Sequence, residues 1–183
     1  MCLVVNCSSN EIFKDDFLSL CSALQFHQTL TGVYMRKIGI GFEAVKAIHD
    51  LIRASQSLQT LDISNNQFGP EMMPTLCEAL TSSKTLRKLN LSWNNIGDDG
   101  AVELSHILSG GVSLSSINIS ENNIRRHGVK ELCRALEYNT TLTVLDISGN
   151  QFRYDGVREI SAMLTENMGL KALFLEDLEI DDD

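Results

Sequence analysis

Residues 86–97 read LRKLNLSWNNIG, and this stretch decides the fold. Its large apolar side chains are Leu86, Leu89, Leu91 and Ile96, with Asn94 between the last two. The alternation from Leu89 to Leu91 is the two-residue period of a β-strand that buries one face. The stretch therefore predicts a short strand that passes directly into a turn.

The same pattern, L-x-x-L-x-L-x-x-N-x-[I/F], recurs every 28 residues along the chain. Strand segments start near residues 2, 30, 58, 86, 114, 142 and 170. The asparagine position is filled by Asn10, Asn66, Asn94, Asn122 and Asn150, and by Ile38 and Leu178 in the two remaining copies. We expect an irregular turn at Ile38 and the end of the asparagine row at Leu178.

Between the strand segments the apolar period changes to about 3.6 residues, which indicates helices. One example is Ala101, Leu104, Ile107 and Leu108, and the same spacing recurs in the later copies. Acidic residues such as Asp98, Asp99 and Asp155 stand at the expected first turns, where they suit the positive end of the helix dipole. The result is an α/β chain of six strand–helix units and a final strand.

On these residues the chain resembles the leucine-rich-repeat proteins of the ribonuclease-inhibitor-like class. The resemblance implies a curved solenoid of about six and a half repeats, with a parallel sheet on the concave face and helices on the convex face. Strands lie about 4.8 Å apart whereas packed helices need about 8–10 Å, so such an array must curve with its sheet inside. We expect one domain over residues 1–180 and an acidic tail at residues 181–183.

The resemblance also implies a role for the repeated asparagines. In such folds the side-chain amide binds backbone groups of the turn that leaves the strand, and so satisfies polar groups that would otherwise be buried without a partner. We expect Asn10, Asn66, Asn94, Asn122 and Asn150 to form this structural ladder.

Composition narrows the class of protein further. The 183 residues contain 15 Lys and Arg against 24 Asp and Glu, a net charge of −9 that argues against a nucleic-acid-coating protein. Six of the last eight residues are acidic, so much of this charge is terminal. The chain has no apolar run long enough for a membrane span, and no signal peptide is expected at Met1. Five cysteines without a C-x-x-C motif fit the reducing cytoplasm.

Catalytic and cofactor-binding motifs do not occur in the sequence, so we expect neither an enzyme nor a bound cofactor. Cys21, His49 and Cys77 share one position of the repeat, which raises the question of a metal site or a Cys–His nucleophile. Equivalent positions on neighbouring helices lie about 8–10 Å apart, too far for ligands of one zinc ion. A small, half-buried structural position is the preferred interpretation, and no metal site is expected.

The candidate functional surface is the concave face, which carries every second side chain of each strand. We select its charged, amide and aromatic residues, together with those at the strand exits, as candidates for partner binding. Ten of these residues are chosen: Tyr34, Arg36, Asp62, Lys88, Asn90, Trp93, Asn118, Glu121, Asp146 and Phe174. Trp93 is the single tryptophan of the chain, and Trp, Tyr and Arg are enriched among interface hot spots. The competing interpretation is that Trp93 folds back over its own turn as packing.

The leading hypothesis is a non-enzymatic scaffold or interaction module for a protein partner, with neither nucleic acid nor a membrane span involved. It rests on the resemblance and on the missing catalytic motifs. The alternatives are a regulator of a small GTPase, or a fragment of a larger protein such as an innate-immune sensor or a cytoskeletal or ciliary scaffold. A designed or truncated array without an evolved partner is a further alternative. We expect a monomer, or a chain whose N-terminal edge is covered by another segment or chain.

Overall fold

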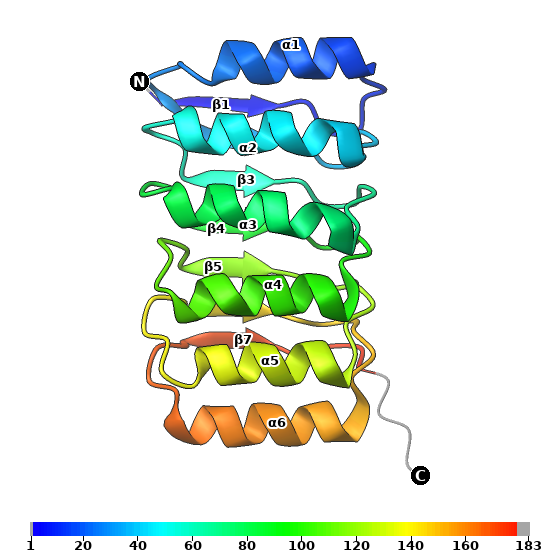
Figure 1. Cartoon of the computed structure of the whole chain (residues 1–183), viewed down its shortest axis with the longest axis vertical. Coiled ribbons are helices and arrows are strands. Elements are labelled where there is room, and N and C mark those ends of the chain that lie inside the picture. Colours follow the sequence, from blue (N-terminus) through cyan, green and yellow to red (C-terminus); the bar gives the residue numbers. More distant parts are fainter. Residues whose placement is uncertain (1, 179–183) are drawn as a thin grey trace.

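The computed structural model describes residues 2–178. The last two residues of the expected domain, Glu179 and Ile180, lie outside this described part, and so does the acidic tail at residues 181–183. Within it, strands and helices alternate along the chain (Figure 1). The strands are β1 (Leu3–Asn6), β2 (Leu30–Tyr34), β3 (Thr60–Asp62), β4 (Lys88–Asn90), β5 (Ser116–Asn118), β6 (Val144–Asp146) and β7 (Ala172–Phe174). The helices are α1 (Lys14–Leu24), α2 (Val45–Ala54), α3 (Met73–Ser82), α4 (Gly97–Ser109), α5 (Arg126–Leu136) and α6 (Arg153–Glu166), with 3-10 turns η1 (Phe42–Ala44) and η2 (Pro70–Met72) before α2 and α3. No helix among residues 2–178 combines the length and apolar character needed to cross a membrane.

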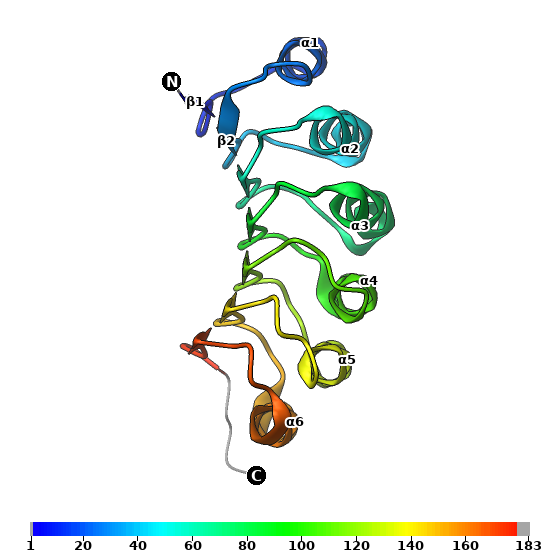
Figure 2. The ribbon, with the colours of Figure 1, turned by 90° about the vertical axis from the view of Figure 1, so that its left-hand side faces the viewer.

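The strands form one parallel sheet in chain order, from β1 to β7. Each strand pairs with the strand 28 residues further on, so that Leu61 lies beside Leu89 and Leu89 beside Ile117. Seen along the strands, the sheet lines the inner side of a curved stack and the helices form its outer side (Figure 2). The curvature follows because helices need more width than strands.

The hydrophobic core runs continuously between the sheet and the helices. In the interior strands Leu61, Leu89 and Ile117 are at most 2% exposed. The equivalent residues of the end strands, Val5 and Leu173, are only partly buried because each has a neighbouring repeat on one side alone. Each repeat thus depends on its neighbours for burial, as expected of a solenoid.

Every strand leaves the sheet through a turn that contains one residue with a left-handed backbone. These residues are Ser9, Lys37, Asn65, Trp93, Glu121, Gly149 and Asp177, and their φ angles lie between 50° and 64°. The prediction of an irregular strand exit at Ile38 is wrong. Lys37 has φ 53°, like its equivalents in the other repeats. Its backbone N–H donates to Ser64 O at 3.1 Å, just as the Asn65 N–H donates to Ser92 O. Ile38 is instead buried as part of the core.

The asparagine side chains connect the turns of successive repeats. The Asn94 amide donates to Leu91 O at 2.8 Å in its own repeat and to Ile63 O at 3.2 Å in the preceding repeat. Its carbonyl oxygen accepts the N–H groups of Asn66 and Phe68, each at 3.1 Å. Asn66, Asn122 and Asn150 make corresponding bonds to the repeat before them.

The two ends of this asparagine row differ from its middle. Asn10 is exposed and donates only to Cys7 O and Ser8 O within its own turn. Ile38 has no amide with which to bind the turn of Asn10, so packing and strand pairing hold the first repeat to the second. Leu178 is likewise a partly buried apolar residue packed against the core.

Candidate functional site

The strand register places one row of polar and aromatic side chains along the concave face. In chain order the row comprises Asn6, Tyr34, Asp62, Asn90, Asn118, Asp146 and Phe174, each paired with the next through adjacent strands. The central four are half-buried, and the flanking Phe174 is 45% exposed. The register therefore brings six of the predicted binding residues into one line.

Hydrogen bonds hold the four central side chains of this row in two pairs. Asn90 Nδ2 donates to Asp62 Oδ2 at 3.2 Å, and Asn118 Nδ2 donates to Asp146 Oδ2 at 2.9 Å. The two amides thus point away from each other, toward carboxylates on opposite sides.

The remaining side-chain polar atom of each pair member, Oδ1, is also hydrogen-bonded. The Oδ1 atoms of Asp62, Asn90, Asn118 and Asp146 each accept the backbone N–H of the serine two residues later, at 2.9–3.1 Å. The centre of the face is therefore a preorganised polar surface, since its side chains are already fixed before any partner arrives.

A second row follows the strand exits, beside the first. There the side chain of Trp93 is exposed, and the residue as a whole is 57% exposed. The backbone N–H of Trp93 donates to Ser120 O at 3.0 Å, which places this residue next to the turn of Glu121. The Glu121 carboxylate lies over Gly149, in space that a Cβ at that glycine would occupy. Trp93 therefore does not fold back as buried packing but stands on the rim of the concave face.

Charge divides the face into two ends. Arg36 and Lys37 lie at the exit of β2, next to Tyr34, and Lys88 is exposed on β4. The described concave residues of β5–β7 and their exits contain four carboxylates and no cation; they are Glu121, Asp146, Glu176 and Asp177. Tyr34 and Phe174 lie on strands separated by four others, so the ten predicted residues form an extended surface rather than one compact site.

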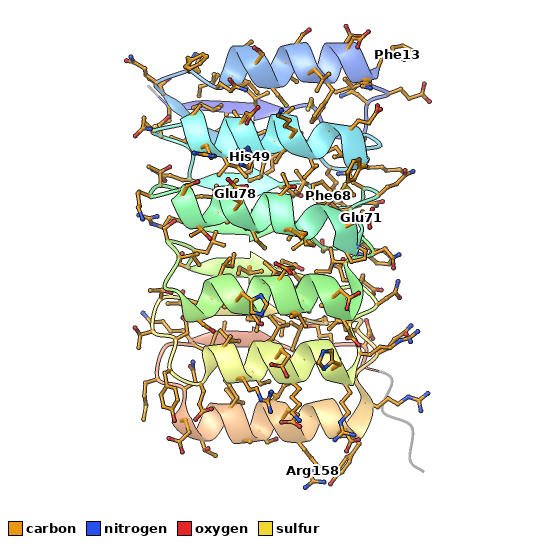
Figure 3. All side chains as sticks on the ribbon, in the orientation of Figure 1. Phe13, His49, Phe68, Glu71, Glu78 and Arg158 are labelled. Carbon is orange, nitrogen blue, oxygen red and sulfur yellow. The ribbon has the colours of Figure 1, made fainter. Side chains whose placement is uncertain are left out.

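The shared repeat position of Cys21, His49 and Cys77 forms no metal-binding group. Within residues 2–178, no three His, Cys, Asp or Glu side chains lie together in a way that could hold a metal ion. His49 instead lies between carboxylates, with Nδ1 2.9 Å from Asp50 Oδ1 and Nε2 3.6 Å from Glu78 Oε1 on α3 (Figure 3). Burial raises the pKa of the Cys21 and Cys77 thiols to about 12, the opposite of what an activated nucleophile needs.

Two features of the surface were missed by reasoning from the sequence. The first is Gly149, whose lack of a side chain makes room for Glu121. A glycine at a position filled by larger residues in other repeats was the available signal. The second is a group of arginines, Arg125, Arg126 and Arg153, beside a recess at the edge where the helices begin. These arginines lie outside the sheet face and strand exits from which the candidate binding residues were chosen.

Comparison with known proteins agrees with this geometry. A family model described as a leucine-rich repeat matches residues 54–71, 82–105 and 138–161. Each of these stretches contains one strand and the turn through which it leaves the sheet. The chain contains leucine-rich repeats. Its 28-residue period, with a helix in each unit, is compatible with the ribonuclease-inhibitor-like class. No curated protein matches the chain in sequence.

Solved structures with the same fold include several leucine-rich-repeat domains. Leiomodin-1 actin-binding site 2 is 24% identical, with a TM-score of 0.57 over 62% of this chain and 67% of that chain. The tropomodulin C-terminal domain of Caenorhabditis elegans is 17% identical, with a TM-score of 0.56 over 91% and 84% of the two chains. An internalin from Listeria monocytogenes is 20% identical, with a TM-score of 0.54 over 96% of this chain but only 42% of that chain. At these identities the likeness shows the fold alone.

Proposed function

We propose that this leucine-rich-repeat chain is a non-enzymatic module that binds a protein partner on its concave sheet and the adjacent strand-exit turns. The observation that carries the proposal is Trp93, an exposed tryptophan in a left-handed turn at the fourth of seven strand exits.

Trp93 occupies a position that other side chains fill more easily. A left-handed backbone costs an ordinary L-residue about 1–2 kcal/mol, whereas glycine and asparagine adopt it readily. Asn65 and Gly149 stand at the same position in other repeats. Because Trp93 remains 57% exposed, burial does not fully repay this cost. Every repeat has a left-handed residue at this position, so the turn itself belongs to the scaffold. The feature that distinguishes Trp93 is its exposed side chain, because tryptophan is among the residues enriched in interface hot spots.

The surroundings of Trp93 suit an interface. The hydrogen-bonded row from Asp62 to Asp146 lies beside it and is fixed in place before binding. A partner that docks there avoids much of the entropy cost of ordering side chains. The aromatic anchor next to a satisfied polar surface is the arrangement that interfaces use at their centre.

The alternatives are less well supported. A GTPase regulator would have to place polar groups at a partner's phosphate-transfer site. No particular residue of the described surface can be assigned to that role. Two structural neighbours are an actin-binding site of leiomodin-1 and a tropomodulin domain, so actin is the first candidate partner to test. The cytoplasm suits a chain whose five cysteines are free. That another segment or chain covers the edge of β1 stays a prediction.

The test compares the wild-type chain with Trp93→Asn and with Tyr138→Asn as a matched control. Tyr138 is an exposed aromatic residue after α5, on the helix side. Affinity capture from lysate of the source organism, followed by mass spectrometry, should retain a protein on the wild type and on Tyr138→Asn but not on Trp93→Asn. Purified actin is tested in the same way by co-sedimentation.

The folding state of the variants is checked by urea denaturation. Trp93→Asn should unfold at the same or a higher urea concentration, with a gain of up to about 1 kcal/mol, because asparagine tolerates the left-handed turn. Equal capture by all three chains would contradict the proposed site. Acceleration of single-turnover GTP hydrolysis by a captured GTPase would favour the regulator instead.

A further inference from the structure

A recess of about 400 Å³ lies at the edge of the solenoid where α5 and α6 begin. The starts of these two helices are on the right in Figure 1. It is lined by Arg125, Arg126, Gln151, Phe152, Arg153 and Asp155. The backbones of Arg125 and Gln151 form an isolated parallel bridge, which brings the two repeats together at this point. Three arginines from two repeats thus border one hollow.

The neighbouring carboxylates do not neutralise all of these arginines. Asp98 Oδ1 accepts the backbone N–H groups of Arg125 at 2.7 Å and Gly128 at 3.0 Å, so it caps the start of α5. Asp155 pairs with Arg126, at 2.9 Å between Nη1 and Oδ2. The side chains of Arg125 and Arg153 are exposed, and no ion pair within residues 2–178 involves them.

Arg153 has a backbone that does not favour an arginine. Its φ angle is 50°, in the left-handed region, while the equivalent residue of the fourth repeat is Gly97 with φ 59°. Glycine adopts this backbone without the steric cost that the Cβ of an arginine incurs. The arginine side chain is therefore present in spite of the local backbone preference.

The wider charge pattern makes the recess distinct from the rest of the molecule. At this edge the three arginines outnumber the two carboxylates that contact them, Asp98 through the Arg125 backbone N–H and Asp155 through the Arg126 guanidinium, in a chain with a net charge of −9. At physiological salt, charges act over about 8 Å, so the local excess determines what binds here.

We propose that the recess bordered by Arg125, Arg126 and Arg153 binds an acidic segment of a protein partner. Guanidinium groups present paired N–H donors that match the oxygens of a carboxylate. A short acidic segment reaches the recess without meeting the acidic remainder of the chain, whereas a long polyanion such as nucleic acid would extend over it and be repelled. The site is separate from the concave face and does not depend on the binding function proposed for it.

The test uses the full chain labelled with ¹⁵N and an eight-residue peptide in which Glu and Ser alternate. Saturable amide shifts should be confined to residues near 125–128 and 151–155. The double variant Arg125→Gln/Arg153→Gln should bind roughly fivefold or more weakly, because two exposed charge pairs are lost. The matched control, Lys46→Gln/Lys84→Gln, changes the net charge equally on exposed lysines elsewhere and should bind as the wild type does.

Three results would overturn the proposal: no saturable shifts, shifts spread over the whole surface, or equal weakening in the control pair. Binding that appears only after removal of residues 179–183 would assign the recess to the chain's own acidic end instead. Tighter binding of a DNA oligonucleotide than of the peptide at the same salt concentration would replace the acidic segment with nucleic acid. A peptide of alternating Lys and Ser should cause no shifts at these residues.

Discussion

At the exits of β3, β4, β5 and β6, a single asparagine amide satisfies backbone groups of two repeats. Asn94 is nearly buried, donates to carbonyl oxygens of residues 63 and 91, and accepts two N–H groups from the preceding turn. Its removal leaves several backbone groups without partners in an environment that excludes water, which is where an unsatisfied group is most costly.

We therefore expect Asn94→Ala to lower the free energy of unfolding by about 1–3 kcal/mol. Asn10→Ala is the matched control, because Asn10 is exposed and bonds only within its own turn, so a change within about 0.5 kcal/mol is expected. Urea denaturation followed by far-UV circular dichroism measures both. Equal losses in the two variants would show that the bonds to the preceding repeat contribute nothing measurable.

At the scale of elements, a glycine near the start of α5 sets how closely that helix approaches α4. A Cβ on Gly128 would lie 2.8 Å from Ile124 Cγ2 and 2.9 Å from the Cβ of Ala101 on α4. Both contacts are shorter than real side chains allow. The general preference of helices for alanine over glycine is thus opposed at this position by the packing between neighbouring repeats.

Gly128→Ala consequently should destabilise the chain by about 1–3 kcal/mol, although helix propensity alone predicts a gain of about 1 kcal/mol. Gly110→Ala provides the comparison, since Gly110 is exposed at the end of α4, has φ −82°, and its added Cβ would be 3.5 Å from its nearest neighbour. That variant should be neutral or more stable by up to about 1 kcal/mol. Thermal unfolding distinguishes the two signs, and a stabilised Gly128→Ala would show that the helices can move apart freely.

For the whole molecule, the stacked architecture implies that the repeats need not open together. Each repeat contacts its neighbours alone, and the core at β1 and β7 is less buried than in the middle. Cys21 on α1, Cys77 on α3 and Cys133 on α5 are buried at one shared repeat position. The reaction of each thiol with an alkylating reagent therefore reports the opening of the first, third and fifth repeats separately.

Burial raises the pKa of each of these three thiols to about 12. Because the thiolate is the reactive form, very little of each thiol is reactive at pH 8 in the folded chain, and the reactive fraction rises with pH. At pH 8 we expect iodoacetamide to modify the exposed Cys2 rapidly and these three slowly. With increasing urea, Cys21 should react before Cys77, because α1 has a neighbouring helix on one side only. Peptide mass spectrometry measures each site, and identical urea midpoints would indicate a single cooperative unit.

The fold was predictable because its determinants are local and repeated. The strand segments, the helices and the chain-order sheet all follow from apolar residues at fixed positions in a 28-residue unit. The turn at Ile38 was predicted wrongly because the left-handed residue Lys37, and not the asparagine position, determines its backbone path. The candidate residues lie on the strands and strand exits expected from the repeat, but the division of that face into a basic and an acidic end emerged only in three dimensions.

The sequence by itself determined the repeat, the positions of the strands and the residues of the core, because burial follows the two-residue and 3.6-residue periods within one unit. Only the tertiary structure decided that Asn90 and Asn118 turn toward opposite carboxylates, that Trp93 stays exposed, and that arginines of two repeats share a recess. These features depend on contacts between side chains about 28 residues apart. Such contacts form when one repeat is stacked on the next, and the pattern within a single unit does not specify them.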